Sequence, residues 1–208
     1  MITVCWAAKG GSGTTVVAAS LALAADRPTL LVDLAGDLPM TLGIPEPDSP
    51  GVHDWLRSEA STDRLTALES RLSDQLSLLP AGHGGGAGRW SELAEHLRRE
   101  VRHVVVDAGT NPPPPTAHIA SIADHDWLVT RPCYLALTAA VRRGHRPSGV
   151  VVIEEPGRAL RAADIEAAIG APIAATLLLD PAIARAVDSG LLVTRIPRGA
   201  QRRLRQAA

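Results

Sequence analysis

The sequence contains no phenylalanine, one tyrosine and only two cysteines among 208 residues. Because Cys5 and Cys133 lie far apart in the chain, they exclude a disulfide scaffold and a zinc cluster, and they favour a reducing compartment. Lys+Arg and Asp+Glu number 21 and 22, so the formal net charge is −1. This balance excludes a globally basic nucleic-acid binder, although it allows a local basic patch.

Long apolar runs are absent as well. No stretch reaches the roughly 18 apolar residues of a membrane-spanning helix, so none is predicted. The run 16–25 follows a short apolar stretch and a glycine turn, which favours a buried helix over a secretory leader. With 46% hydrophobic and 21% charged residues, the chain is typical of a globular protein. Its length predicts one domain, residues 1–194, followed by an arginine-rich tail, residues 195–208.

Lysine is almost absent. Of the 21 basic residues, one is a lysine, Lys9, and the other 20 are arginines. A coding bias toward arginine explains the excess and carries no information on the fold. If all basic positions were equivalent, chance would place the one lysine at this position about once in 21. We therefore expect that position 9 requires an ammonium group rather than a guanidinium group.

Strand and helix patterns alternate along the chain. Solid apolar runs predict strands at 2–7, 29–33, 76–79, 104–107, 127–130, 150–153 and 173–179. Helical patterns cover 15–25, 52–58, 61–73, 91–99, 119–123, 135–143, 162–169 and 181–189. Such alternation implies right-handed crossovers. The predicted fold class is therefore α/β, with three layers: a mostly parallel central sheet and helices on both faces.

A glycine-rich loop lies between the first strand and the first helix. It reads Lys9, Gly10, Gly11, Ser12, Gly13, Thr14 and Thr15. Glycines let the backbone curl so that successive N–H groups point inward, and the following helix adds partial positive charge. The Thr15 hydroxyl is placed to bind a magnesium ion that accompanies phosphate. The loop therefore predicts a phosphate site, the alternative being a tight turn without a ligand.

Two further strands end in an acid. Asp33 follows TLLV and Asp107 follows VVV. In a parallel sheet the carboxyl ends of the strands share one edge, so both acids are expected beside the glycine loop. Carboxylates there would hold Mg²⁺ or its water molecules. We predict Thr15 and Asp107 as the metal-binding residues.

These motifs together resemble the MinD/ParA family of P-loop ATPases, whose deviant Walker A pattern is KGGxGK[ST]. TLLVDLAGD, HVVVDAGT, WLVTRP and the segment from ADIEAAIGAPI to LLLDPAIARAVDSG are similar to successive parts of that family. The resemblance implies a three-layer P-loop NTPase fold and a site for ATP or ADP with Mg²⁺. It also implies that Lys9 is the signature lysine, which reaches the nucleotide of the partner subunit in a sandwich homodimer.

Two departures from the family pattern concern catalysis. Thr14 stands where the family has the lysine that grips the β- and γ-phosphates, and Ala35 stands where a second acid follows Asp33. Asp33 is the predicted catalytic residue of this segment, and Asp37 lies two residues beyond the missing acid. Since phosphoryl transfer depends on positioning and charge, both losses predict slow or absent hydrolysis. Whether the chain is an enzyme stays open, and no adenine-contacting residue is predicted.

The resemblance is greatest to the CpaE/TadZ and septum-site-determining branch, and it implies a nucleotide-dependent dimeric switch or scaffold. Such a protein would position a pilus or secretion machinery or a division site through a protein partner. The alternatives are a nucleotide-free pseudo-ATPase scaffold and an active ATPase for DNA or cargo partitioning. The arginine-rich tail could contact a membrane surface, DNA or neither. The expected location is cytoplasmic, with the inner membrane face or a cell pole as peripheral alternatives.

The seven histidines show no metal-ligand spacing. None belongs to an H-E-x-x-H motif or to a cysteine–histidine cluster. We therefore expect them on the solvated surface.

Overall fold

The structure is a computed structural model that describes residues 1–84 and 88–194. The strands are β1 (Ile2–Ala7), β2 (Thr29–Asp33), β3 (Ser70–Arg71), β4 (Leu76–Leu79), β5 (His103–Thr110), β6 (His125–Thr130), β7 (Gly149–Glu154) and β8 (Ile173–Leu178). The helices are α1 (Thr14–Ala24), α2 (Leu38–Leu42), α3 (Val52–Leu56), α4 (Asp63–Ala67), α5 (Trp90–Arg98), α6 (Ala117–Ala120), α7 (Tyr134–Arg143), α8 (Ala162–Ile169) and α9 (Pro181–Asp188). One 3-10 turn, η1, spans Pro114–Thr116.

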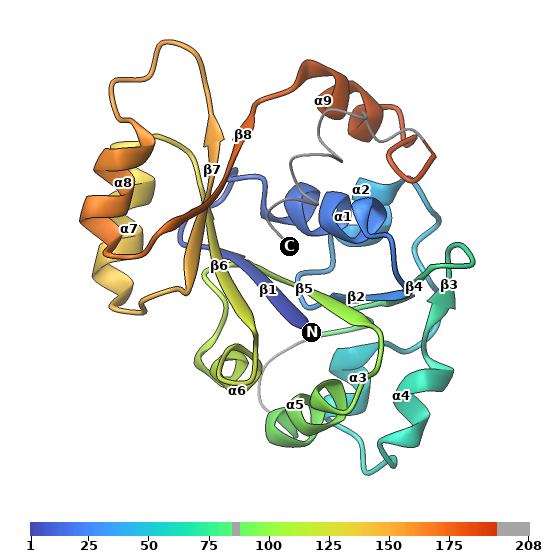
Figure 1. The fold of residues 1–208 in the computed structure, drawn as a ribbon. Coiled ribbons are helices and arrows are strands. Elements are labelled where there is room, and N and C mark those ends of the chain that lie inside the picture. The colour runs from blue at the N-terminus through green and yellow to red at the C-terminus, as the bar shows by residue number, and fades with distance from the viewer. Residues whose placement is uncertain (85–87, 195–208) are drawn as a thin grey trace.

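The strands form one sheet in the order β3-β4-β2-β5-β1-β6-β7-β8 (Figure 1). All neighbouring strands pair in parallel except β3 and β4, which are antiparallel. The chain order reverses at β1, which lies between β5 and β6. Ligands of open α/β sheets bind at such a reversal, outside the carboxyl ends of the strands. The predicted fold class is confirmed.

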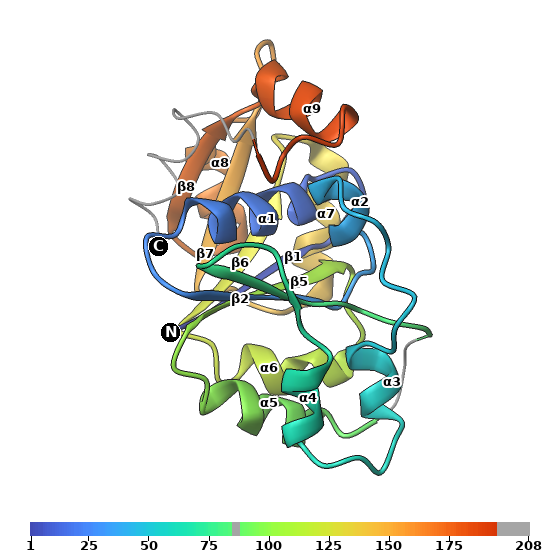
Figure 2. The ribbon, with the colours of Figure 1, turned by 90° about the vertical axis from the view of Figure 1, so that its right-hand side faces the viewer.

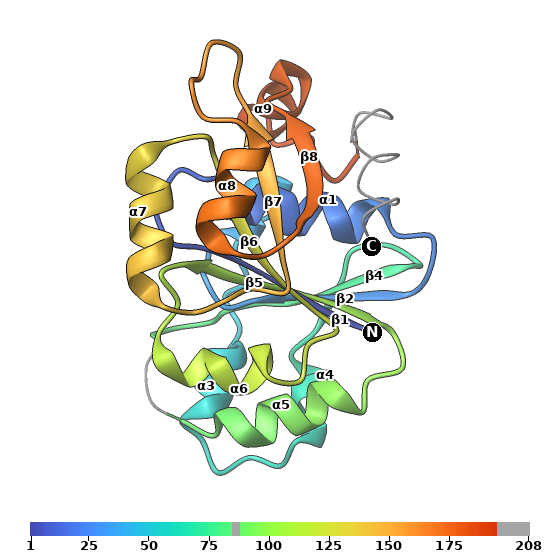
Figure 3. The same cartoon turned by 60° about the vertical axis from the view of Figure 1, so that its left-hand side comes forward.

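Helices cover both faces of the sheet. α1, α2 and α9 lie on one face, and α3, α4, α5 and α6 lie on the other (Figure 2). α7 and α8 lie side by side (Figure 3), and their buried residues Ala140 and Ile165 belong to the same hydrophobic cluster as those of α5 and α6. The core therefore consists of two layers, one on each side of the sheet.

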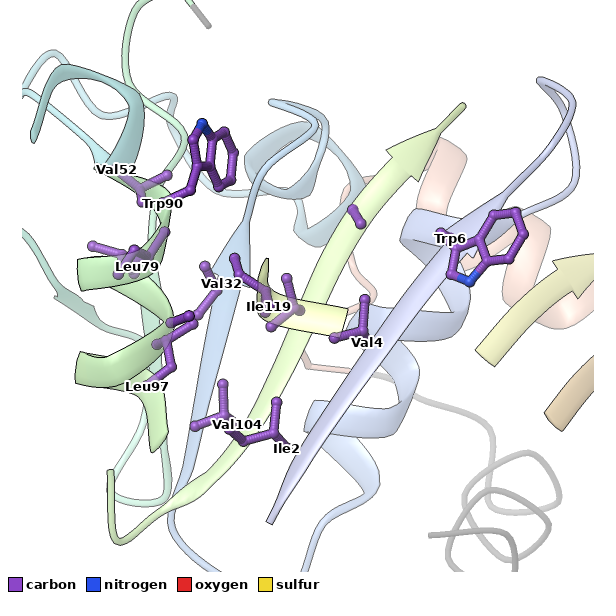
Figure 4. Close-up of a cluster of buried hydrophobic side chains, with 14 of the residues drawn as sticks. Ile2, Val4, Trp6, Val32, Val52, Leu79, Trp90, Leu97, Val104 and Ile119 are labelled. Atoms are coloured by element: carbon purple, nitrogen blue, oxygen red, sulfur yellow. The ribbon is translucent and has the colours of Figure 1, made fainter. Parts of the chain in front are cut away.

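The spacing of apolar residues on α5 explains how that helix packs. Trp90, Leu93 and Leu97 recur at helical spacing and are buried, which gives one apolar stripe along the helix. In Figure 4, Trp90 and Leu97 face a group that includes Val32 and Val104 of the sheet. Trp6, farther along β1, belongs to the same cluster and lies at its end away from Trp90.

Two local predictions were wrong. The pattern over 61–73 favoured one helix, but the helix α4 ends at Ala67 and Ser70–Arg71 pairs with β4. Pairing at the sheet edge outweighs the helical propensity of this segment. The short helix α2 was not predicted. Its start depends on backbone N–H groups, up to that of Leu38, that donate hydrogen bonds to the Asp33 carboxylate.

Two glycines bring the ends of α2 and α9 into direct backbone contact. Gly43 ends α2 with a φ of 75°, and Gly190 follows α9 with a φ of 65°. A Cβ atom added at Gly43 would lie 2.0 Å from the carbonyl oxygen of Gly190. Only a residue without a side chain fits at position 43, so the two helix ends touch.

The expectation that the histidines are all on the surface was wrong for His53 and His103, which are buried. Burial, together with the positive charge of Arg27, lowers the pKa of His103 to about 4. Its Nε2 atom lies 3.3 Å from the hydroxyl of Thr3. The site therefore favours the neutral imidazole.

We expect His103 to destabilise the protein in acid. A histidine of the unfolded chain has a pKa of about 6.5, so the unfolded state binds the proton first. Stability is then lost as the pH falls from about 6.5 through 4, by about 2–3 kcal/mol in total. Thermal unfolding of His103→Gln between pH 7 and pH 4 should show a smaller loss than the wild type. The exposed His118 provides the control His118→Gln, and equal pH profiles for all three proteins would contradict the assignment.

In residues 1–84 and 88–194, no helix has the length and apolarity needed to cross a membrane.

Candidate functional site

The glycine loop, Lys9–Thr15, connects β1 to α1 at the carboxyl edge of the sheet. Gly11 and Gly13 have φ values of 77° and 88°, a region that other residues rarely adopt. The Ser12 hydroxyl donates a hydrogen bond of 2.8 Å to the carbonyl oxygen of Lys9, which closes the turn. The curled backbone and the amino end of an 11-residue helix together provide the features of an anion site.

Lys9 is exposed at the start of this loop. Hydrogen bonds from backbone N–H groups at the start of α7 lower the pKa of the Cys133 thiol, and the positive charge of Lys9 adds to this effect. The lysine therefore lies close to the amino end of α7. The next residues of that helix, Tyr134 and Leu135, are 73% and 62% exposed. An accessible ammonium group and two large exposed side chains thus lie in the neighbourhood of the amino end of α7.

Asp107 lies beside Asp33 at the end of β2, but β5 continues beyond it to Thr110, so the prediction that this strand ends at the acid was wrong. Asp107 pairs in register with Cys5 of β1 and Asp33 of β2, and its side chain is fully buried. Burial raises the pKa of Asp107 to about 7, and repulsion by Asp33 and Asp37 contributes, while hydrogen bonds with Thr15 and Gly109 oppose the rise. The interaction with Thr15 links the acid to the first turn of α1.

Asp33 is also buried, but its hydrogen bonds all go to the backbone. Its Oδ1 atom accepts from the N–H groups of Ala35 and Gly36 at 3.0 and 2.7 Å, and its Oδ2 atom accepts from Leu38 at 3.1 Å. These bonds fix the turn into α2. In this arrangement Asp33 organises the loop, and its predicted catalytic role stays a prediction.

The acids leave one buried oxygen for a ligand. Among the described residues, Asp107 Oδ2 has no hydrogen-bond partner, which is costly for a buried carboxylate. No group of three His, Cys, Asp or Glu side chains in 1–84 and 88–194 is spaced to hold a metal. Magnesium that is bound largely by phosphate and water, with one or two protein groups, fits this arrangement. Thr15 and Asp107 therefore suit the Mg²⁺ of a nucleotide better than a free metal ion.

A pocket of about 500 Å³ adjoins the glycine loop. One wall comes from Gly13, Val16 and Val17, and the opposite wall comes from the end of β8 and from α9. Its lining is mainly apolar, and its volume is typical of small-molecule sites. The sequence did not predict this half of the site, since its wall residues are ordinary apolar residues of distant segments. The Asp180–Pro181 turn that starts α9 was the one local signal.

No family model matches the chain, and no curated protein matches it with statistical significance. Several solved structures do. A ParA family ATPase from Chlorobium tepidum TLS matches with a TM-score of 0.75 at 20% identity, over 98% of this chain and 96% of that one. The septum site-determining protein MinD of Pyrococcus horikoshii OT3, complexed with Mg-ADP, matches with a TM-score of 0.76 at 20% identity, over 100% and 95%. The MinC:MinD cell division protein complex of Aquifex aeolicus matches with a TM-score of 0.77 at 19% identity, over 99% of this chain and 93% of that one. The chain therefore has the fold of the ParA and MinD ATPases.

Proposed function

We propose that this chain, which has the fold of the ParA and MinD ATPases, is a nucleotide-dependent dimeric switch or scaffold that positions a cellular assembly. The observation that supports this best is the composition of one sheet edge. The glycine loop, the buried Asp107 and the 500 Å³ pocket adjoin there. They match the phosphates, the magnesium ion and the base of a nucleoside triphosphate respectively.

In this proposal each part of the loop has a role. The backbone N–H groups of Gly10, Gly11, Ser12, Gly13 and Thr14 bind the phosphates. Thr15 and Asp107 hold the Mg²⁺, Asp107 through bound water. When bound, the ion would neutralise phosphate charge and orient the phosphates. The solved MinD of Pyrococcus horikoshii holds Mg-ADP, which supports the same nucleotide class here.

We infer that hydrolysis is weak or absent. Thr14 supplies a hydroxyl, which is buried, where a lysine would supply a full positive charge to the phosphates. Ala35 has no acid to orient water, and Asp33 uses its hydrogen-bonding capacity on the backbone. Both differences lower the stabilisation of the transition state more than they lower ground-state binding.

Dimerisation would follow from Lys9. Its exposed position beside Tyr134 and Leu135 fits an interface with a second copy, across which the ammonium group reaches the partner's nucleotide. A protein partner is also proposed, because the similar MinD of Aquifex aeolicus is found with MinC. A role of the CpaE/TadZ type, at a pilus, secretion machinery or division site, is the finer proposal. The tail at 195–208, proposed to meet membrane or DNA, lies outside the described residues. A cytoplasmic location, peripheral at the membrane or a pole, belongs to the same proposal.

Titration with ATP and ADP, with and without Mg²⁺, tests nucleotide binding by calorimetry and thermal shift. We expect saturable, Mg²⁺-dependent binding with turnover far below the roughly 1–100 s⁻¹ typical of kinases. The absence of any nucleotide effect on either readout would favour the nucleotide-free scaffold. Turnover in the kinase range would favour the active ATPase.

The variant Thr14→Lys should bind ATP-Mg²⁺ about ten- to a hundredfold more tightly than the wild type, because a charged hydrogen bond to phosphate replaces a neutral one. Turnover should stay low, because Ala35 is unchanged. Thr14→Met is the matched control, since it adds a side chain of similar length without charge. An equal gain in both variants would show that charge is not the cause.

A further inference from the structure

The two edges of the sheet differ in how they are protected. At one edge, β3 has only two residues, and its Arg71 forms an exposed ion pair of 2.6 Å with Asp74. Short, charged edge strands resist pairing with other chains. At the other edge, β8 has six residues without a charge or a proline, and it pairs regularly with β7 from Ala175 to Leu178. The protection found at β3 is therefore missing at β8.

The side of β8 that faces away from β7 is open, and we call it the β8 edge. In residues 1–84 and 88–194, no strand pairs with it. Figure 3 looks toward this end of the sheet, with β8 and α8 nearest to the viewer. The side chain of Leu178 is 53% exposed here. An open, uncharged edge strand with an exposed apolar side chain is a template for a further strand.

The hydrogen bonds with β7 show which backbone groups the β8 edge offers. Leu179 donates its N–H to the carbonyl oxygen of Glu154 at 2.9 Å. Because the backbone groups of successive residues in a strand point in opposite directions, the N–H and C=O groups of Thr176 and Leu178 point away from β7. An added strand would bond to these residues.

The β8 edge is complementary to a second copy of itself. Two strands related by a two-fold axis run antiparallel, and a residue on the axis faces its own copy. With Thr176 on the axis, the two Thr176 residues exchange backbone hydrogen bonds, and their hydroxyls lie side by side. Ala175 then faces Leu177, and Leu178 faces the small residue Ala174. No pair brings like charges together, whereas a charged peptide would find no opposite charge on this strand.

We propose that β8 pairs antiparallel with β8 of a second copy, so that the two sheets join into one across a two-fold axis. The centre of this interface, Thr176, is not part of the lining of the 500 Å³ pocket, and Lys9 lies elsewhere, in the loop after β1. The β8 pair therefore needs no nucleotide. If ATP also joins copies through Lys9, which rests on the proposed function, each copy has two separate contact surfaces and the copies assemble into an open chain.

Sedimentation velocity without nucleotide tests the β8 pair, at about 1 to 200 µM protein, a range that covers micromolar association. The wild type should change from monomer to dimer across this range. Thr176→Lys places two ammonium groups opposite each other and should weaken association at least about tenfold. Thr66→Lys is the matched control on the exposed surface of α4 and should dimerise like the wild type. A wild type that stays monomeric, or equal association of the two variants, would overturn the proposal.

A charge-reversal pair separates pairing from misfolding. Thr176→Glu should also be monomeric alone, whereas an equal mixture with Thr176→Lys should form dimers, because opposite charges then meet on the axis. A mixture that stays monomeric would contradict this geometry.

The variant Lys9→Ala distinguishes the β8 pair from the dimer that ATP is proposed to drive. It should keep the nucleotide-free dimer, and Thr176→Lys should still dimerise when ATP-Mg²⁺ is added. Loss of the nucleotide-free dimer in Lys9→Ala would assign that dimer to the glycine loop and overturn the β8 pair. A missing response to ATP in both the wild type and Thr176→Lys would instead count against the proposed function alone.

Discussion

At pH 8 and without nucleotide, Asp107→Asn is expected to unfold about 5–10 °C above the wild type. Asp107 is fully buried, and its pKa is raised to about 7, whereas an aspartate in the unfolded chain has a pKa near 3.9. The folded state therefore binds the proton more tightly. The stability that this proton supplies is complete below about pH 4 and is lost as the pH rises through 7, which costs about 3–4 kcal/mol.

The replacement removes this cost and keeps the hydrogen bond from Gly109. The oxygen of the new amide can still accept from the Gly109 N–H, which bonds Asp107 Oδ1 at 3.0 Å in the wild type. Differential scanning calorimetry from pH 8 to pH 5 should show the gap between variant and wild type shrinking. Asp37→Asn removes an exposed acid of the same group and should change stability by less than about 0.5 kcal/mol. A gap that is absent at pH 8, or constant with pH, would contradict the argument.

The same variant should lose the Mg²⁺ dependence of ATP binding. An amide oxygen is a weaker partner for a metal-bound water than a carboxylate, and the repulsion that favours a cation disappears. ATP titrations with Mg²⁺ and with EDTA should give similar affinities for Asp107→Asn and different affinities for the wild type. If Asp107→Asn is more stable and its ATP binding no longer depends on Mg²⁺, then Asp107 serves Mg²⁺ binding at the expense of stability.

Lys9→Ala and Lys9→Arg should both prevent ATP from driving the protein into a dimer. Nucleotide that is bound between two copies shifts the equilibrium toward the dimer by mass action. Lysine offers a compact charge on a slim stem, whereas the arginine fork is longer and planar. Between the glycine loops of two copies we expect space for the lysine side chain and not for the arginine side chain. The loss of dimer should be at least about tenfold in the association constant, as for one charged hydrogen bond.

Sedimentation velocity measures the fraction of dimer with ATP-Mg²⁺, with a slowly hydrolysed analogue and without nucleotide. Arg64→Ala removes an exposed cation from α4, on the far face of the sheet, and should dimerise like the wild type. Circular dichroism checks that each variant is folded. A wild-type mass that is the same in all three conditions, whether monomer or dimer, would sink the cross-dimer role of Lys9.

The parallel architecture was predictable from the sequence, because solid apolar runs such as VVV before Asp107 are typical of strands that are covered on both faces. The placement of Asp33 next to Asp107 followed from that architecture, and their register pairing confirms it. The edge strand β3 was not predictable, because two residues pair only where β4 is already in place.

The nucleoside-sized pocket could not be predicted for a different reason. Residues such as Val16 and Ile183 have no chemical signature, and only the crossover of the chain brings them together. The structural role of Asp33 was hidden in the same way, since its bonds to Gly36 and Leu38 exist only once the turn has formed. Sequence predicts charged groups with fixed spacing well, and it predicts apolar walls poorly.

The backbone contact between Gly43 and Gly190 couples the turn that holds Asp33 to one wall of the apolar pocket. α2 follows directly from the turn that Asp33 fixes, and α9 forms one wall of the apolar pocket. A single methyl group at position 43 would act as a wedge, since its nearest neighbour would be 2.0 Å away. The clash would displace α9 and so change the shape of the pocket, although Gly43 is not part of the pocket lining. The absence of a side chain at position 43 thus sets the distance between the ends of α2 and α9.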